Sequence, residues 1–461
     1  MLKRYIGDKS FYRRVMAIAI PIILQNLMTN FVSMLDNVMV GQLSTAQISA
    51  VTIANNNLLF IFNLCLFGGA AGAGIFTTQF YGSGDLEGIR YTFRFKLLIC
   101  LALSALGAAV FLTASEPLIE LYLQGEGDPA LAAEILYYGK QYLFIMMLGM
   151  IPFAISNTYA STLRECGHAT VPMVASLAAT GVNLSLNYVL IFGHLGFPAM
   201  GVAGAAIATV IARYAECVIL IVWTHANPKK NPYIRGIYKS FYIPGHLLKT
   251  VTRKGMPLLL NECIWSFGIA ILNQCYSVCH LDVVPALSIS TTIYNLTAVV
   301  FRSFGNTSGI LVGQLLGAGK AKEEIRDYTR KLFALCIASG VAFGLLTLVL
   351  SGIFPKIYNT TGSVQQLAMY LIMISASTMP AQAYIFPVYF IMRAGGKTMS
   401  TFFFDCGIIW AVSIPIAFTL SRLPAPSIIL IFILTNLVDV LKCVIGYFMI
   451  KQDSWIQNLT R

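Results

Sequence analysis

Long, uncharged apolar segments recur along nearly the whole chain of 461 residues. A helix of about 20 such residues is long enough to span a hydrocarbon core of roughly 30 Å. Charged residues make up only 11% of the sequence and its mean hydropathy is +0.74, which leaves far more apolar surface than a soluble core needs. The sequence therefore predicts an all-α polytopic membrane protein.

We count twelve spans, six in each half of the chain. Their predicted centres lie near residues 28, 63, 106, 146, 181, 212, 267, 298, 342, 378, 411 and 438. Most of the 31 Lys and Arg residues fall in the segments that a cytoplasmic N-terminus would place inside, whereas the outer segments hold only Lys140, Lys356 and Arg422. Because positive charge accumulates on the cytoplasmic side, we expect a multi-pass protein of the cell membrane with both termini cytoplasmic.

The net charge of +12 follows from the same asymmetry. Basic inner loops face the anionic lipids of the cytoplasmic leaflet, so the lipid bilayer accounts for the charge and no nucleic-acid partner is needed. The N-terminal segment is basic, but the apolar run after it is too long for the core of a signal peptide. We expect the first span to be retained.

The chain divides at a polar, basic stretch interrupted by three prolines. We predict an N-terminal six-helix lobe over 1–225, a cytoplasmic linker over 226–249 and a C-terminal six-helix lobe over 250–461. Four motifs recur in order between the halves: Pro21 with Pro257, GIFTTQFYGSG from Gly74 with GILVGQLLGAG from Gly309, Pro152 with Pro380, and RECGHAT from Arg164 with RAGGKTM from Arg393. Such parallel repeats predict two pseudo-symmetric lobes with a substrate cavity between them.

One carboxylate, Asp36, lies in the otherwise uncharged segment that follows Pro21. An ionised Asp in hydrocarbon costs several kcal/mol, so such residues usually face a cavity or a partner and mark an ion pathway. The alternative is that Asp36 lies at the outer end of the span and contacts lipid headgroups. We favour the functional interpretation.

The sequence also excludes other sources of chemistry and energy. The run GQLLGAGKA resembles a phosphate loop, but its glycine spacing is one residue too long and Ala321 stands where Ser or Thr is required. Uphill transport would then depend on an ion gradient. No catalytic set is predicted within the spans, because all five histidines fall in loops or at span ends: His168, His194, His225, His246 and His280. We therefore expect neither an enzyme nor a cofactor.

The ordered motifs carry a family resemblance. Pro21, DNVMVG from Asp36, QFYGSG, GQLLGAG and GVAGAAIAT from Gly201 together resemble the multidrug and toxic compound extrusion (MATE) family over essentially the whole chain. MPLLLNECIW from Met256 and the closing SWIQNLTR are similar to the variant common among Gram-positive bacterial members. The resemblance implies a secondary antiporter that exports cationic, amphipathic compounds in exchange for Na⁺ or H⁺.

The resemblance also suggests a cation-coupling and substrate-binding group in the N-terminal lobe. Asp36 takes the acidic position of the first span, Asn183 and Asn187 lie four residues apart on one helix face, and Thr209 lies in the sixth span. Members with a complete cation site carry Asp where this chain has Asn187. The only metal ion that the resemblance implies is a transient Na⁺ at Asp36. Because one carboxylate of that site is missing here, a proton on Asp36 becomes the favoured coupling ion.

Glu262 is the second acid embedded in the membrane, and the repeat aligns it with Asn26. It resembles the acid of the seventh span that other members use for coupling or for holding a cationic substrate; the alternative is a structural, hydrogen-bonded Glu. Relatives carry a further acid in the tenth span, where this chain has none and Tyr384 is the nearest polar aromatic residue. A C-lobe sodium site of that type would be incomplete.

The remaining charges within spans have structural explanations, with one exception. Asp439 with Lys442 and Arg213 with Glu216 are three residues apart and can pair along their helices. Arg302 has no local acid, so we expect it to pair with Glu262 or Asp36 or to bond backbone carbonyls. The candidates to line the substrate cavity are Asn26, Tyr294, Arg302 and Tyr384, and aromatic rings there would bind an organic cation.

We predict mutual exclusion at Asp36, where an incoming H⁺ or Na⁺ neutralises the carboxylate and releases a small cationic substrate outward. One chain supplies both lobes, so a monomer suffices. The alternative function is a flippase for lipid-linked oligosaccharides of similar two-lobe build. That function would need a broad basic groove, for which the spans offer only Arg302 and Arg213.

Overall fold

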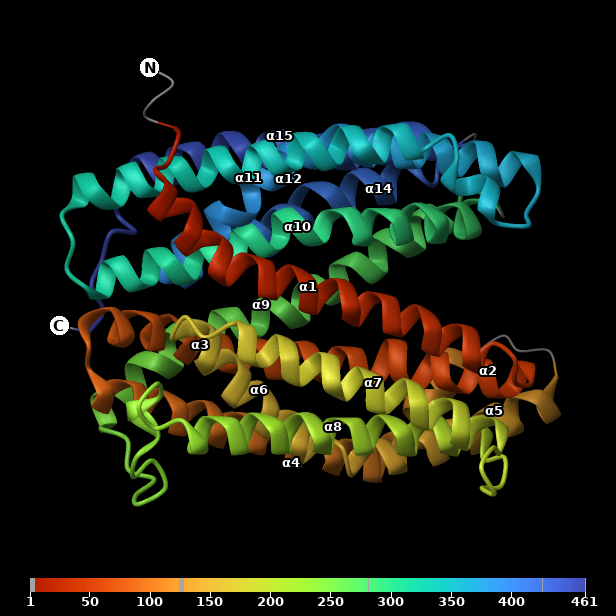
Figure 1. Ribbon diagram of the computed structural model, residues 1–461. Coiled ribbons are helices and arrows are strands. Elements are labelled where there is room, and N and C mark those ends of the chain that lie inside the picture. The colour runs from red at the N-terminus through yellow and green to blue at the C-terminus, as the bar shows by residue number, and fades with distance from the viewer. Residues whose placement is uncertain (1–4, 124–127, 281, 425, 461) are drawn as a thin grey trace. The chain divides into compact units, whose positions relative to one another are not determined.

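The computed structural model describes residues 5–123, 128–280, 282–424 and 426–460, and over these residues it contains helices and no strands (Figure 1). The first half of the chain forms α1 (Lys9–Val40), α2 (Thr45–Val51), η2 (Thr52–Leu59), α3 (Phe60–Ser83), α4 (Leu86–Leu123), α5 (Pro129–Met147), α6 (Met150–Glu165), α7 (Thr170–Phe192), α8 (Gly201–Ala226) and the short η3 (Pro232–Ile234). The second half forms α9 (Gly245–Ser277), α10 (Val283–Gly317), α11 (Lys322–Leu350), η4 (Phe354–Ile357), α12 (Gly362–Ala394), α13 (Thr398–Phe402), η5 (Phe403–Gly407), η6 (Ile409–Ser413), α14 (Ile414–Leu420) and α15 (Ile428–Lys451).

The lengths of these helices confirm the predicted polytopic membrane protein. Among the described residues, 11 helical segments are long and apolar enough to cross a membrane. The pair α5 and α6, bent by 50° at the break between them, brings the number to 12 if it forms one span. Every predicted span centre falls within one of these segments or this pair.

Three segments of the membrane helices depart from α-helical winding. The segments η2, η5 and η6 are π-helical, and η5 and η6 interrupt the span that runs from Thr398 to Leu420. Backbone groups in hydrocarbon must be satisfied internally, and a π-helical turn keeps them bonded while it accommodates an extra residue. These segments were not predictable from the sequence, because hydropathy and helical periodicity do not distinguish a short π-helical segment from the α-helix around it.

Helix ends follow local side-chain chemistry. The Asp8 carboxylate accepts the N–H of Phe11 at 2.9 Å at the start of α1, and this hydrogen bond lowers the pKa of Asp8. Asp128 accepts the N–H of Ala130 at 2.9 Å before α5, whose first residue is a proline. Such capping groups satisfy N–H donors that have no partner within the helix.

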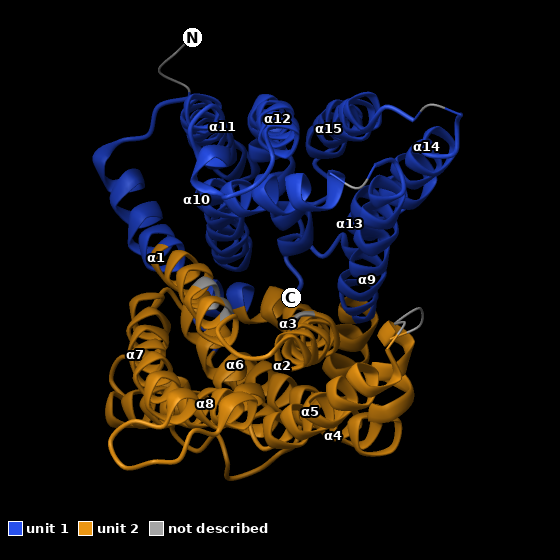
Figure 2. Cartoon of the chain, turned by 90° about the vertical axis from the view of Figure 1, so that its right-hand side faces the viewer, with its two compact units in different colours: residues 1–23, 78–85, 256–461 blue, residues 24–77, 86–255 orange. Residues whose placement is uncertain are grey.

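The chain forms two compact units, coloured separately in Figure 2. The first comprises Met1–Ile23, Thr78–Asp85 and Met256–Arg461, and the second comprises Leu24–Thr77 and Leu86–Gly255. These units follow contacts rather than chain order, so α1, α3 and α9 each contribute residues to both. The predicted lobes follow chain order and remain a prediction.

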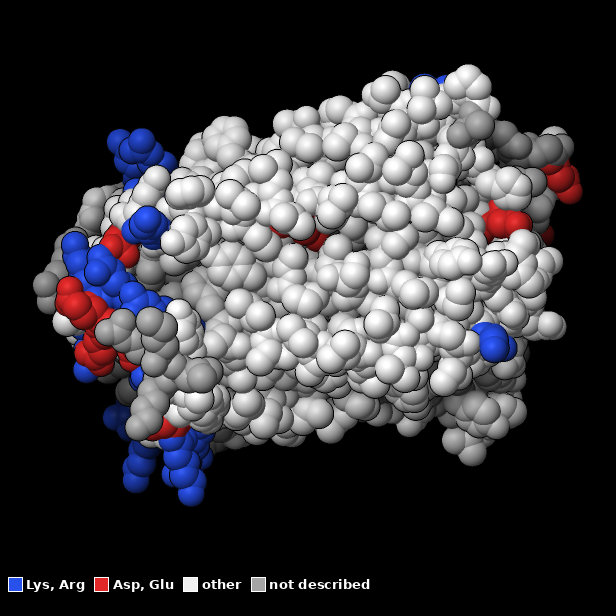
Figure 3. Space-filling view, turned by 90° about the horizontal axis from the view of Figure 1, so that it is seen from above, with Lys and Arg blue, Asp and Glu red and all other residues white. Residues whose placement is uncertain are grey.

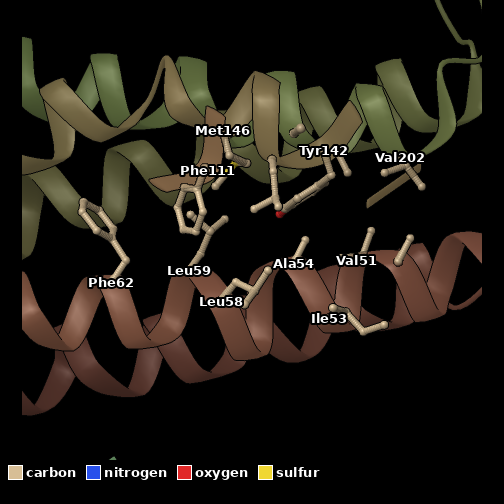
Figure 4. Packing of buried hydrophobic residues seen from close by; sticks show 14 of the residues in the cluster. Val51, Ile53, Ala54, Leu58, Leu59, Phe62, Phe111, Tyr142, Met146 and Val202 are labelled. Atoms are coloured by element: carbon tan, nitrogen blue, oxygen red, sulfur yellow. The ribbon is translucent and has the colours of Figure 1, made fainter. Parts of the chain in front are cut away.

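The second unit has a continuous core in which the stretch from α2 to α3 packs against α4, α5 and α8 (Figure 4). Phe62 of α3 and Phe111 of α4 meet edge to face, with ring centroids 6.4 Å apart. Leu59, Leu143 and Met146 are completely buried within this cluster. Lipid tails are as apolar as these side chains, so close packing rather than escape from water stabilises the arrangement.

In the first unit, four glycines spaced by four residues form a smooth ridge on α10. Gly305 and Gly309 approach the backbone of α12 at Phe386 and Phe390, and Gly317 approaches the backbone carbonyl of Gln79. Small residues permit such close contact between membrane helices. The contacts therefore show that this glycine series packs membrane helices closely together.

Few charged side chains lie in the middle of the face shown in Figure 3. On the face shown in Figure 3, Lys and Arg gather at one end, and a broad central band consists almost entirely of uncharged residues. This pattern is typical of a surface whose middle contacts hydrocarbon.

We expect Gly317→Ala to lower stability, because a Cβ at this position would overlap the Gln79 carbonyl. Overpacking of this kind costs about 1–3 kcal/mol. The measurement is thermal unfolding of the purified protein in detergent. The matched control is Gly181→Ala in α7, where nothing lies within 4 Å of the added carbon. Equal melting temperatures for the two variants would contradict the proposed ridge contact.

Candidate functional site

A chain of hydrogen bonds joins the four residues predicted for the N-terminal coupling group. The amide nitrogen Nδ2 of Asn187 donates to Oδ1 of Asp36 at 2.7 Å and to Oδ1 of Asn183 at 3.2 Å. Nδ2 of Asn183 donates in turn to the Thr209 hydroxyl at 3.2 Å. The structure thus brings residues from α1, α7 and α8 of the second unit together in one group, hereafter the Asp36 group.

The helical spacing explains how this group forms. Asn183 and Asn187 are one turn apart on α7 and are both nearly inaccessible, at 6% and 2% exposure. Thr209 reaches Asn183 from α8, and its own hydroxyl proton goes to the Ala205 carbonyl at 3.0 Å. Asp36 is half-buried and comes from α1. Polar residues thus line the place where these three helices approach one another.

One oxygen of the Asp36 group remains unused. The side-chain amide of Asn187 uses its nitrogen Nδ2 to donate to Asp36, but its buried oxygen Oδ1 has no hydrogen-bond partner. A buried polar atom without a partner costs about 1–3 kcal/mol. Carboxylate, amide and hydroxyl oxygens are also the ligands that hard cations prefer. The group can therefore accept either a proton or a small hard cation.

Glu262 lies in a different environment, within the first unit. Its Oε1 is 3.9 Å from Nη1 of Arg393, which lies near the end of α12. The same Nη1 donates to the Tyr389 hydroxyl at 3.1 Å, and the guanidinium lies 4.9 Å from the centre of that ring. Glu262 is thus paired with Arg393, not with Arg302 as one of the sequence-based hypotheses proposed.

A second polar network adjoins Glu262 through its neighbour Asn261. Nδ2 of Asn261 donates to the Tyr389 hydroxyl and to Oδ2 of Asp405, both at 3.1 Å. Oδ1 of Asp405 lies 3.4 Å from the Lys442 ammonium. Asn261 and Tyr389 were not predicted as site residues from the sequence. Asp405 could have indicated such a network, because an acid within a span requires hydrogen-bond donors from other helices.

Arg302 is satisfied by aromatic rings. Its guanidinium lies 5.2 Å from the centre of the Tyr294 ring and 5.4 Å from that of Phe386, and its Nε is buried without a hydrogen-bond partner. The Tyr294 hydroxyl bonds the side chain of Gln382, which donates to Asp439 at 2.9 Å. Cation–π contact thus takes the place of the backbone carbonyls that the sequence suggested as an alternative.

Two predicted pairs within helices are replaced by other contacts. Lys442 meets Asp405, not Asp439, and Asp439 accepts a hydrogen bond from Gln382. Arg213 lies over the Phe153 ring at 4.6 Å and donates to the Gly149 carbonyl at 3.5 Å, while no ion pair with Glu216 is found among the described residues. Spacing along one helix did not identify the partner on the neighbouring helix.

The other two candidate cavity residues lie on α1 and α12. Asn26 is on α1 with an exposed side chain. Tyr384 is on α12, where its ring lies 5.0 Å from that of Phe333. Their role as cavity-lining residues stays a prediction.

A buried ion pair that the sequence analysis did not predict lies near the start of α4. The fully buried Lys96 is paired with Glu165, and its ammonium also donates to the Thr162 hydroxyl at 3.2 Å. The Lys and Arg residues that fall in the predicted inner segments include Lys96 and Arg94, and both are buried and hydrogen-bonded within the second unit.

A model of the MatE family matches residues 21–189 and 257–419, which together cover most of the chain. The chain belongs to the MatE family. The two matched segments contain Asp36, Asn183 and Asn187 in the first half and Glu262 in the second.

Curated relatives of this MatE protein agree with the family assignment. It is 23% identical over 413 residues to a "Probable multidrug resistance protein NorM" of Thermotoga maritima, which covers 89% of this chain and 86% of the relative. It is 24% identical over 427 residues to the "Uncharacterized transporter YisQ" of Bacillus subtilis, with 89% and 88% covered. The family is one of multidrug efflux transporters rather than enzymes.

Solved structures of MatE-type transporters share the fold. The MATE transporter VcmN of Vibrio cholerae superposes with a TM-score of 0.84 at 16% identity over 97% of this chain and 99% of that one. A transporter of the MOP superfamily from Pyrococcus furiosus superposes with a TM-score of 0.83 at 16% identity over 98% of both chains. At this identity the likeness concerns the fold alone.

We expect Glu262 and Arg393 to be energetically coupled and Glu262 and Arg302 to be independent. Double-mutant cycles with Glu262→Gln, Arg393→Gln and Arg302→Gln, measured as thermal stability in detergent, separate the two cases. Contacting charges give interaction free energies of about 0.5–3 kcal/mol, whereas separate sites add. Coupling to Arg302 that equals or exceeds the coupling to Arg393 would contradict the observed pairing.

Proposed function

We propose that this MATE-family protein is a secondary active antiporter that exports cationic or amphipathic small molecules in exchange for H⁺ or Na⁺. The observation that carries the proposal is the Asp36 group, in which a half-buried carboxylate meets a hydrogen-bonded chain of amide and hydroxyl groups. A carboxylate in a membrane segment is costly unless its charge is used or compensated. The partner of Asp36 is Asn187, whose amide donates a hydrogen bond but carries no charge.

Proton coupling fits this arrangement. With Asp36 ionised, the group carries one negative charge that attracts a cationic substrate. A proton arriving from the outer side removes this charge, and the protonated carboxyl can donate a hydrogen bond to a neighbouring oxygen. The buried Oδ1 of Asn187, which has no other partner, is a suitable acceptor. The substrate then loses its electrostatic attraction and is released, so proton and substrate exclude each other.

Sodium coupling would use the same oxygens. Asp36, Asn183, Asn187 and Thr209 each supply at least one oxygen, but only Asp36 supplies a negative charge. A site with one carboxylate attracts Na⁺ less than a site with two, because each added charge strengthens the attraction in a medium of low dielectric constant. We therefore propose H⁺ as the preferred coupling ion.

Glu262 has a secondary role in this proposal. Arg393 already lies within ion-pair distance of it, so its charge is partly compensated. A compensated carboxylate attracts a substrate cation less than an uncompensated one. We infer that Glu262, in the middle of α9, chiefly positions Arg393 near the end of α12 and contributes to coupling less than Asp36.

The proposed setting is the cell membrane, with both termini cytoplasmic and a monomer as the working unit. The names of relatives, such as the Thermotoga maritima protein described as a probable multidrug resistance protein, support small-molecule drugs as the cargo. A flippase for lipid-linked oligosaccharides would need free cationic groups, whereas Arg302 and Arg213 both lie over aromatic rings.

The first experiment measures efflux of a fluorescent organic cation from proteoliposomes, driven by either a pH gradient or a Na⁺ gradient. Because Asp36 carries the only charge of its group, we expect Asp36→Asn to reduce gradient-driven efflux roughly tenfold or more. Glu262→Gln should reduce it less. We expect the pH gradient to drive the wild-type protein more strongly than the Na⁺ gradient does.

The control for this experiment is Glu120→Gln, which neutralises an exposed acid near the end of α4. It should leave efflux within about twofold of the wild-type rate, as expected for an exposed charge outside the site. Efflux by Asp36→Asn at the control's rate would refute the proposed coupling site. If neither gradient moves the dye, the substrate class is wrong and the lipid-linked alternative gains support.

A second variant adds the missing carboxylate. Asn187→Asp places a negative charge beside Asp36, within the distance now spanned by a 2.7 Å hydrogen bond. Two carboxylates attract Na⁺ more strongly than one, so we expect the Na⁺ concentration for half-maximal efflux to fall roughly tenfold. Asn187→Leu, which is similar in size but has no polar atoms, should not gain Na⁺ dependence. An unchanged response to Na⁺ in both variants would exclude Asn187 from the ion path.

A further inference from the structure

The loop between α8 and α9 folds back onto the start of α4 and is held there by two arginines of that helix. Arg94 is buried, and its guanidinium donates to the carbonyls of Ile237 at 2.8 Å and Tyr242 at 3.1 Å. Nε of Arg90 donates to the Tyr233 carbonyl at 3.0 Å. The polar stretch predicted as a cytoplasmic linker is therefore an ordered loop, hydrogen-bonded to α4 within the second unit.

This folding forms an open surface cavity of about 490 Å³ whose charged residues are mainly basic. Its lining includes four basic side chains and a single acid: Arg90, Arg94, Arg235, Lys239 and Glu87. Glu87 already lies 3.7 Å from Arg90, so it compensates part of one charge only. Gly236, at φ +77°, makes the left-handed turn that places Arg235 and Lys239 around the cavity.

The two outer cations are available to a ligand. The side chains of Arg235 and Lys239 are exposed, and among the described residues no ion pair or side-chain hydrogen bond holds either of them. Arg90 and Arg94 are already bonded to the loop carbonyls and form the inner wall. The cavity therefore combines a fixed basic wall with two unpaired cations at its mouth, which suits an anionic phosphate group.

The position of the cavity along α4 indicates the source of that phosphate. A helix of 38 residues is about 57 Å long, so it extends past a hydrocarbon core of roughly 30 Å. Arg90 and Arg94 lie in its first three turns, outside a core of that thickness centred on the middle of the helix. The loop beside them exposes three aromatic side chains, Tyr238 at 45%, Phe241 at 52% and Tyr242 at 65%. Exposed aromatic rings at the end of a span are typical of the membrane interface.

We propose that this cavity binds the headgroup phosphate of an anionic phospholipid of the cytoplasmic leaflet. Arg235 and Lys239 contact the phosphate, and the exposed rings of Tyr238, Phe241 and Tyr242 lie against the lipid. Bound lipid would hold the loop between α8 and α9 against α4. This proposal concerns neither Asp36 nor Glu262 and does not depend on the transported substrate.

The test is binding of phosphatidylglycerol to the delipidated full-length protein in detergent, measured by native mass spectrometry beside phosphatidylcholine with the same acyl chains. We expect a preference for phosphatidylglycerol that Arg235→Gln/Lys239→Gln weakens roughly tenfold, since each cation near a lipid surface contributes appreciably. The matched control, Lys229→Gln/Lys249→Gln, removes two exposed lysines that do not line the cavity. It should weaken binding less than twofold.

A variant that is expected to bind the lipid more tightly distinguishes the loss of a binding site from misfolding. Glu87→Gln removes the only acid of the cavity and should tighten phosphatidylglycerol binding roughly twofold to fivefold. Equal losses in the two double variants, or no loss in either, would overturn the proposal in favour of diffuse charge attraction or of no site. Displacement of the lipid by millimolar inorganic phosphate would also overturn it, since the cavity would then select a free anion.

Discussion

Groups that are polar or charged must find partners inside the protein wherever the surroundings are hydrocarbon, and this constraint determines much of the packing within each unit. Asp36 accepts a hydrogen bond from Asn187, and Glu262 is within ion-pair distance of Arg393. Asp405 is paired with Lys442 and accepts a hydrogen bond from Asn261. In each case the partner comes from another helix. These contacts therefore do more than neutralise charge, because they select which helix faces pack against each other.

The two membrane-embedded acids singled out in the sequence are satisfied in different ways. Asp36 accepts a hydrogen bond from a neutral amide, whereas Glu262 has a guanidinium nitrogen at 3.9 Å. A neutral partner leaves the net charge of the group at minus one, and a cationic partner removes it. The difference gives the two acids unequal capacity to attract an external cation, and it explains why the proposed coupling function rests on Asp36.

Much of the fold follows from the sequence, because the length and hydropathy of each span are local properties. The grouping of Asn183 with Asn187 follows from their helical spacing, but the family resemblance was needed to add Asp36 and Thr209. Partners between helices were the least predictable. Lys442 was assigned to Asp439 by spacing and meets Asp405 instead, since spacing defines a helix face but not the helix that faces it.

The π-helical segments η5 and η6 have a consequence for how such a chain tolerates change. A π-helical turn holds one residue more than an α-helical turn, so losing a residue there can restore regular winding without breaking the hydrogen-bond ladder. The span from Thr398 to Leu420 thus has positions at which deletions shift the register of later side chains rather than truncate the helix. A deletion at such a position can rotate one face of the helix, including Asp405, relative to the neighbouring helices. The span remains long enough to cross the bilayer.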